Sequence, residues 1–173
     1  QKKMLRELKI VDLRWQKKQN GFIIANYKKH PFFDEIYGQI ELIFKKKYIF
    51  LIDVLIDSME ICNNIFNIET KLLLASEIDI DKSLIKDDLV INILKKIEAK
   101  IYISGKGAKD YQDHMKFERE GIRLKYQKFS HPIYNQKNSQ KFELGLSCLD
   151  SAFNLGCLES EKLLKEMKDI EEN

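Results

Sequence analysis

Short apolar runs alternate with amphipathic segments in the middle of the chain, and this alternation is the feature that most limits its fold. Residues 71–75, 101–103 and 122–129 are predicted to be strands. Between them lie two predicted helices, residues 83–98 and 109–120, whose apolar side chains recur every three or four positions. Strands that alternate with helices form a parallel sheet joined by right-handed crossovers. We therefore predict an α/β fold with a small parallel sheet flanked by helices.

The first half of the chain is predicted to be rich in helix. Pro31 is expected to be the first residue of one of these helices, because a proline at that position loses no helical hydrogen bond. No repeat, linker or low-complexity segment interrupts the chain, so residues 1–173 are interpreted as a single domain. The further elements expected are a short strand at 8–13 and helices at 14–29, 31–44, 49–66, 146–155 and 160–170.

Composition excludes several classes of protein. The hydrophobic fraction of 44% and the charged fraction of 33% are typical of a folded domain with a well-solvated surface. Thirty basic against 27 acidic side chains give a net charge of only +3, too small an excess for a dedicated nucleic-acid binder. No apolar run approaches the roughly 18 residues that span a bilayer, and no signal peptide is expected. The three cysteines have no CxxC spacing, which predicts reduced thiols in a cytoplasmic protein.

The loops after the predicted strands are where a ligand is expected, because open parallel sheets bind ligands at the carboxyl ends of their strands. In residues 104–109, SGKGAK, the glycines let backbone N–H groups approach a ligand, and Lys106 or Lys109 adds positive charge. The segment is neither a Walker A motif nor a GxGxxG fingerprint. Two interpretations stay open: a site for a phosphate or carboxylate, and an ordinary turn between a strand and a helix.

The segment His131-Pro132-Ile133-Tyr134 is a less common combination of residues. Histidine is the side chain best suited to general acid–base catalysis near neutral pH, although a single loop histidine is more often structural. Asp110 and His114 stand four positions apart and could share one face of a helix. A metal site would need a third ligand at a diagnostic spacing, so we predict no metal site and a solvated helix face instead.

Five blocks of the sequence, in the same order, resemble blocks of the WbqC-like family, whose members are found with bacterial O-antigen and surface-polysaccharide genes. Ala108, Asn135 and Gly145 stand where the family usually has glycine, proline and asparagine. Family members usually open with a segment HQPxYLPWxGYF, which is absent here, so we expect this chain to be the C-terminal part of a longer member. The blocks are NYKKHPFFD at 26–34, similar to NYKKAPYF; YISGKGAKDY at 102–111, similar to YLSGxxGKDY; FEREGI at 117–122, similar to FxxxGI; FSHPIYNQ at 129–136, similar to FxHPxYxQ; and LSCLDSAFNLG at 146–156, similar to LSxLDxxFNxG.

The resemblance implies a cytoplasmic enzyme of bacterial surface-glycan (O-antigen, lipopolysaccharide) biosynthesis. The hypothesis is an acyl- or aminoacyl-transferase that acts on a nucleotide-linked amino sugar. Its general base would be His131, and Tyr134 and Asp150 would orient the reacting groups. The ligand would be a nucleotide sugar or sugar phosphate, with no nucleic acid, and the assembly a homo-oligomer. The residues expected to bind substrate are Ser104, Gly105, Gly107, Lys109, Asp110, Tyr111, Gln136 and Asn154.

Two questions stay open at this point. No cofactor follows from the sequence or from the resemblance. The alternative to an enzyme is a non-catalytic or degenerate domain that binds a partner of the glycan-synthesis machinery through its helical N-terminal half. The absent opening segment favours this alternative, whereas the presence of Ser104, Lys109, Asp110, His131 and Asp150 together argues against it.

Overall fold

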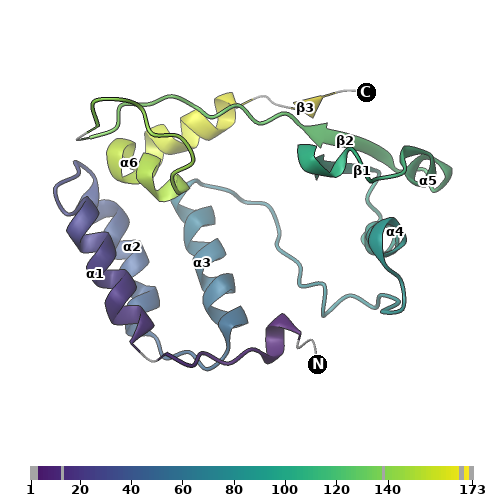
Figure 1. Ribbon diagram of the computed structural model, residues 1–173, viewed down its shortest axis with the longest axis horizontal. Coiled ribbons are helices and arrows are strands. Elements are labelled where there is room, and N and C mark those ends of the chain that lie inside the picture. The colour runs from purple at the N-terminus through teal and green to yellow at the C-terminus, as the bar shows by residue number, and fades with distance from the viewer. Residues whose placement is uncertain (1–3, 13, 138, 168–169, 172–173) are drawn as a thin grey trace. The chain divides into compact units, whose positions relative to one another are not determined.

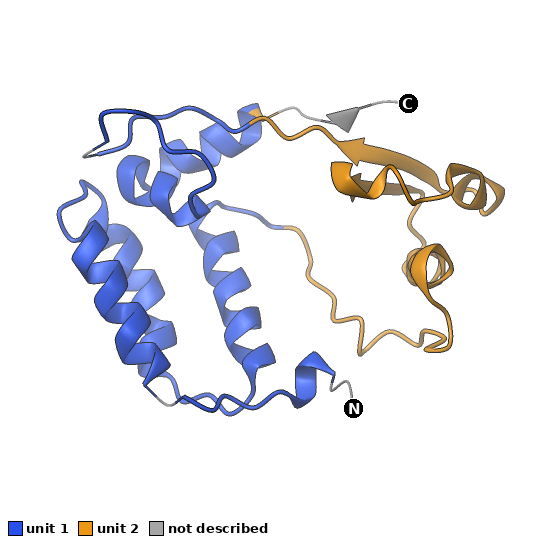
Figure 2. Cartoon of the chain, in the orientation of Figure 1, with its two compact units in different colours: residues 1–69, 131–166 blue, residues 70–130, 167–173 orange. Residues whose placement is uncertain are grey.

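The computed structural model describes residues 4–12, 14–137, 139–167 and 170–171, and the chain divides into two compact units (Figure 1 and Figure 2). Unit 1 comprises Gln1–Glu69 and His131–Glu166, and unit 2 comprises Thr70–Ser130 and Met167–Asn173. The helices and the parallel strands confirm the predicted α/β class. Within the described ranges, no helix is both long enough and apolar enough to cross a membrane. The single domain stays a prediction.

Unit 1 is a group of helices around one hydrophobic core. Helix α2 turns a clear apolar stripe inwards: Ile36, Ile40 and Ile43 are all buried, at the spacing of successive helical turns. Phe153 of α6 is fully buried and stacks on the ring of Tyr27 at the end of α1, with ring centroids 4.4 Å apart. The elements are η1 (Leu5–Glu7), α1 (Trp15–Tyr27), α2 (Phe33–Lys45), α3 (Leu51–Ile65) and α6 (Cys148–Glu166), shown in Figure 1.

Helix α6 changes direction at Gly156, which has φ 78° and ψ 173°. A Cβ atom at this position would lie 2.7 Å from a ring carbon of Phe32, so both the backbone conformation and the close packing require glycine. The two helical segments on either side of Gly156 agree with the separate helices predicted at 146–155 and 160–170, although the second ends earlier, at Glu166.

Unit 2 contains a small mixed sheet of order β1-β2-β3. Strand β1 pairs with β2 in parallel, from Ile101↔Arg123 to Gly105↔Gln127, as the alternation of strand and helix predicts. A third short strand, β3, pairs antiparallel with β2. The core of the unit contains Phe117, Leu124 and Tyr126, each at most 2% exposed. The elements are α4 (Lys86–Lys96), β1 (Ile101–Gly105), η2 (Lys106–Ala108), α5 (His114–Arg119), β2 (Arg123–Gln127) and β3 (Ile170–Glu171).

Two predicted strands are wrong. Residues 71–75 form an irregular segment in which Leu72 and Leu73 are 45% and 49% exposed. The apolar run there is not covered on both faces, and among the described residues β1 pairs only with β2, so it adds no strand to the sheet. At 8–13, Lys9 forms an isolated antiparallel bridge with Phe50, and Leu13 lies outside the described residues.

Two predicted helix starts are also wrong. Pro31 lies in a turn, and α2 begins at Phe33, because Phe32 has non-helical dihedral angles (φ −110°, ψ 23°) and serves as the N-cap residue; its N–H donates to the carbonyl of Phe153 at 3.3 Å. Helix α5 begins at His114 and not at residue 109, since the Asp113 side chain caps it by accepting the N–H of Met115 at 3.0 Å. Asp110 is therefore not on a helix face with His114.

Candidate functional site

The carboxylate of Asp150 is the centre of a network of hydrogen bonds in unit 1. Asp150 lies in the first turn of α6 and is 5% exposed. Its Oδ2 atom accepts the hydroxyl of Tyr134 at 2.8 Å and side-chain amides of Gln136 and Asn154, each at 3.3 Å. A buried carboxylate is costly unless it is well paired. The network therefore gathers four residues that the sequence analysis assigned to the site.

Gln136 and Asn154 also hold the loop that runs beside Asp150. The Gln136 side chain donates to the carbonyl of Glu143 at 3.0 Å and accepts its N–H at 2.7 Å. Asn154 donates to the carbonyl of Asp150 at 2.8 Å and accepts the N–H of Lys137 at 2.7 Å. These amides thus fix the backbone on both sides of the loop relative to α6.

A pocket of about 450 Å³ opens beside Asp150 in unit 1. Asp150 and Glu143 contribute negative charge to its lining, whereas Lys137 and Lys141 contribute positive charge. Such a pocket suits a ligand that carries both an ammonium and an acidic group. Its lining residues are Gln136, Lys137, Ser139, Gln140, Lys141, Glu143, Leu146 and Asp150.

Tyr134 acts as a hydrogen-bond donor in this network at neutral pH. Burial raises the pKa of its phenol to about 12, Gln136 opposes this rise, and the Asp150 carboxylate adds to it. The phenol therefore keeps its proton and is suited to donating to Asp150 and not to accepting a proton; that Tyr134 and Asp150 orient the reacting groups stays a prediction.

His131 lies beside Phe142, whose ring also contacts Tyr134. The ring centroids of His131 and Phe142 are 5.6 Å apart, and those of Tyr134 and Phe142 are 5.3 Å apart, both with the edge of one ring towards the face of the other. The Nδ1 atom of His131 is 3.0 Å from the carbonyl oxygen of Pro132. Phe142 thus brings His131 and Tyr134 into one aromatic cluster.

The other predicted site residues belong to unit 2. Ser104 is 4% exposed and lies in β1, which ends at Gly105. Gly107 lies in the turn η2, and the Nζ atom of Lys109 is 5.8 Å from the ring centroid of Tyr126. Asp110 and Tyr111 follow in an exposed turn. That these residues and the Asp150 network form one site stays a prediction.

Comparison of the sequence with models of known protein families identifies the family of this chain. The family model described as the WbqC-like protein family matches residues 1–162. The chain belongs to the WbqC-like protein family. No curated protein and no solved structure matches it. In this WbqC-like protein the matched residues include the whole Asp150 network and the pocket beside it. They also include residues 104–109 of unit 2, the glycine loop.

The sequence analysis missed two residues beside this candidate site, Tyr27 and His30. Burial raises the pKa of Tyr27 to about 12, and the nearby Asp150 carboxylate adds to the rise. His30 is 9% exposed, and its ring centroid is 4.9 Å from that of Tyr27. Both lie in the block 26–34 that carried the family resemblance. Their position in that block, three residues apart and just before Pro31, was the available signal.

His30 is held as a neutral imidazole beside the Asp150 network. Burial lowers its pKa, and the ammonium of Lys137 adds to this decrease, whereas Asp150 and the carbonyl of Tyr27 oppose it. Its Nδ1 atom is buried and makes no standard hydrogen bond within the described chain. His30 is therefore a buried base that belongs to the same electrostatic environment as Asp150.

Proposed function

We propose that this WbqC-like protein is a cytoplasmic enzyme of bacterial surface-glycan biosynthesis that transfers an acyl or aminoacyl group to the amine of a nucleotide-linked amino sugar. The observation that carries the proposal is the buried carboxylate of Asp150 in the wall of a pocket that also presents lysines. Nucleotide-linked amino sugars combine an amine with phosphates, so the two kinds of charge in the pocket match the two kinds in the ligand.

In this mechanism the substrate amine binds at Asp150, and Lys137 and Lys141 attract its phosphates. Tyr134 and Tyr27 keep their protons and hold the carboxylate in place. The bound ammonium first loses one proton to solvent, which frees the lone pair of its nitrogen. His131 accepts the second proton as this nitrogen bonds to the acyl carbonyl carbon, and the donor's leaving group departs with its bonding electrons. The glycine loop of unit 2, with Lys109, remains a second candidate for holding a phosphate.

A binding experiment tests the role of Asp150. The full chain is titrated calorimetrically with UDP-glucosamine, which has a free amine, and with UDP-N-acetylglucosamine, in which that amine is acylated. We expect the free amine to bind at least about tenfold more tightly, because a buried carboxylate favours a cation close to it. Asp150→Asn should remove this preference.

The chain offers a matched control for that substitution. Asp57 of α3 also accepts a tyrosine hydroxyl, that of Tyr48, at 2.5 Å, and it does not line the pocket beside Asp150. Asp57→Asn should therefore leave the preference for the free amine unchanged. Equal affinity of the wild-type chain for the two sugars would rule out an amine site at Asp150.

The reaction itself is tested in cells. His131→Ala, placed in the genomic copy, should reduce the acyl substitution of the surface glycan at least about tenfold, as measured by mass spectrometry of the isolated polysaccharide. An unchanged glycan would exclude His131 as the base. If nucleotide-sugar binding were absent as well, the result would favour the non-catalytic, partner-binding alternative.

A further inference from the structure

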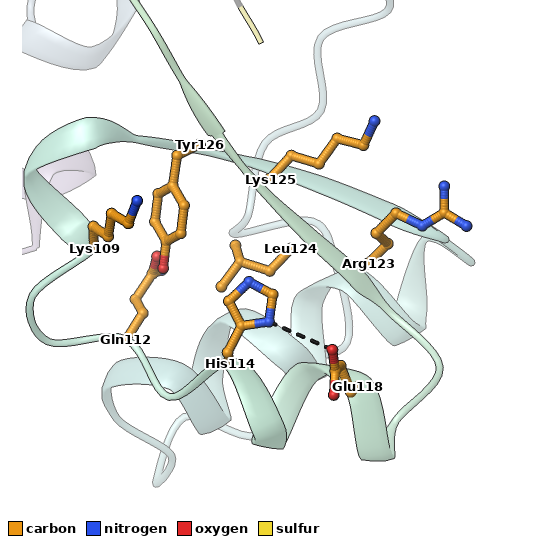
Figure 3. Close-up of a pocket in the computed structure, with 8 residues that line it drawn as sticks. All are labelled: Lys109, Gln112, His114, Glu118, Arg123, Leu124, Lys125 and Tyr126. Carbon is orange, nitrogen blue, oxygen red and sulfur yellow. Dashed lines mark ion pairs between the residues drawn. The ribbon is translucent and has the colours of Figure 1, made fainter. Parts of the chain in front are cut away.

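Unit 2 contains a pocket of its own, of about 640 Å³, next to strand β2 (Figure 3). Pockets of this volume are in the range that takes small molecules. Of its residues, the sequence analysis assigned only Lys109 to substrate binding. The lining residues are Lys109, Gln112, His114, Glu118, Arg123, Leu124, Lys125 and Tyr126.

The alternation of β2 decides which of these side chains face the pocket. Leu124 and Tyr126, which are 1% and 2% exposed, point to one side of the strand, where His114 and Lys109 lie (Figure 3). Arg123 and Lys125 alternate with them and extend away from that side (Figure 3). The pocket interior is therefore formed by a few polar groups over an apolar floor.

Lys109 places its ammonium in this interior. Its Nζ atom is 5.8 Å from the centroid of the Tyr126 ring, close enough for a favourable contact between the cation and the aromatic face. The Nδ1 atom of His114 is 3.7 Å from Glu118, the acidic residue of the lining. An anion that enters beside Lys109 thus meets a cation that the aromatic ring holds in position.

Gln112 supplies a hydrogen-bond acceptor to the pocket, whereas the Lys109 ammonium is a donor. The Oε1 atom of its side chain is buried and has no hydrogen-bond partner within the described ranges. A buried amide oxygen left unpaired is destabilising, so such atoms normally meet a protein group, a water or a ligand. A molecule with a hydroxyl group in the pocket would satisfy it.

We propose that this pocket binds a phosphate ester that also carries hydroxyl groups, with Lys109 holding the phosphate and Gln112 accepting a hydroxyl. This is the chemistry of the sugar-phosphate part of a nucleotide sugar. That the natural ligand is a nucleotide sugar rests on the proposed function. The binding chemistry itself follows from the residues of unit 2.

Calorimetry on the full chain with three probes tests the proposal. Inorganic phosphate supplies only the anion, N-acetylglucosamine only the hydroxyls, and N-acetylglucosamine 1-phosphate both. We expect the ester to bind at least about tenfold more tightly than either fragment. Lys109→Met and Gln112→Leu should each weaken the ester by about tenfold, and Gln112→Glu by more, because its charge repels the phosphate.

Lys106 provides the matched control, because it carries the same charge in the same loop and does not line the pocket. Lys106→Met should leave the affinity for the ester unchanged. Equal losses in Lys106→Met and Lys109→Met, or no gain of the ester over its fragments, would overturn the proposal. Circular dichroism identifies any variant that fails to fold, and Gln112→Glu, which conserves side-chain size, then decides the result.

The same set of variants separates this inference from the proposed function. Asp150→Asn should leave binding of N-acetylglucosamine 1-phosphate unchanged, because Asp150 does not line the pocket of unit 2. If Lys109→Met and Gln112→Leu bind the ester normally while the preference for the free amine depends on Asp150, only the present inference fails. If these variants lose the ester but Asp150→Asn does not change the preference for the free amine, the proposed function fails and this pocket remains a phosphate-ester site.

Discussion

At the scale of single residues, Asp150 affects the proton affinity of its neighbours in unit 1. Its charge adds to the effect of burial on Tyr27 and Tyr134, and the pKa of each phenol is raised to about 12. An ordinary tyrosine titrates near pH 10. Both phenols therefore remain donors throughout the physiological range.

The raised pKa of Tyr27 predicts a loss of stability in alkali. The unfolded chain releases this proton near pH 10, whereas the folded chain keeps it until about pH 12. The contribution is thus fully present below pH 10 and disappears as the pH rises towards 12. Tyr27→Phe should reduce the alkaline fall in the free energy of unfolding by about 1–2 kcal/mol, discounted for partial exposure.

Urea denaturation of both proteins at pH 9 and pH 11.5 measures this difference. Tyr111→Phe is the control, because the Tyr111 side chain is 74% exposed and lies in unit 2. The explanation fails if both substitutions change the alkaline loss by the same amount.

At the scale of elements, the break in α6 depends on one glycine. Gly156→Ala would put a Cβ atom 2.7 Å from the ring of Phe32 and force an alanine into a backbone conformation that only glycine adopts readily. We expect a destabilisation of about 2–4 kcal/mol in urea titrations. In Gly38→Ala, by contrast, the new Cβ on α2 meets no atom within 4 Å, and the helix should gain about 0.5–1 kcal/mol. Similar effects of the two substitutions would contradict this account.

The start of α5 is a second local feature with a measurable energy. Asp113 accepts the N–H of Met115, and Asp113→Ala should therefore lower the free energy of unfolding by about 1 kcal/mol. Asp110→Ala, in the exposed turn just before it, is the control and should change stability by less than about 0.5 kcal/mol. A larger effect at Asp110 than at Asp113 would mean that the cap does not determine where the helix begins.

At the scale of the whole molecule, the chain passes from unit 1 to unit 2 through a segment with no helix or strand. Residues 68–85 are largely exposed and include Lys71 and Lys82. Trypsin should cut first after one of these lysines, because proteases act on exposed irregular chain. Mass spectrometry of the early fragments identifies the cut. An initial cleavage inside α1, for example after Lys18, would contradict this prediction.

The sequence by itself determined the elements with strong periodicity. The apolar stripe of α2 and the alternation in β2 specify a buried face by local spacing alone, and the parallel pair of β1 and β2 followed from their order with a helix between them. The residues Tyr134, Gln136, Asp150 and Asn154 were selected from sequence blocks, and the fold brings them together. The run at 71–75 failed because apolar character does not by itself supply a partner strand.

Only the tertiary structure placed Tyr27 and His30 beside Asp150. Local spacing marks no clear apolar face on α1, and it does not tell which residue of α6 this helix will meet. The stacking of Tyr27 on Phe153 aligns the end of α1 with the first turns of α6, and this alignment brings the Tyr27 phenol near the Asp150 carboxylate. Likewise, the N–H of Phe32, just before α2, donates to the carbonyl of the distant Phe153, a contact that no local pattern predicts. Side-chain packing between elements is long-range in sequence, and single-sequence patterns carry only short-range information.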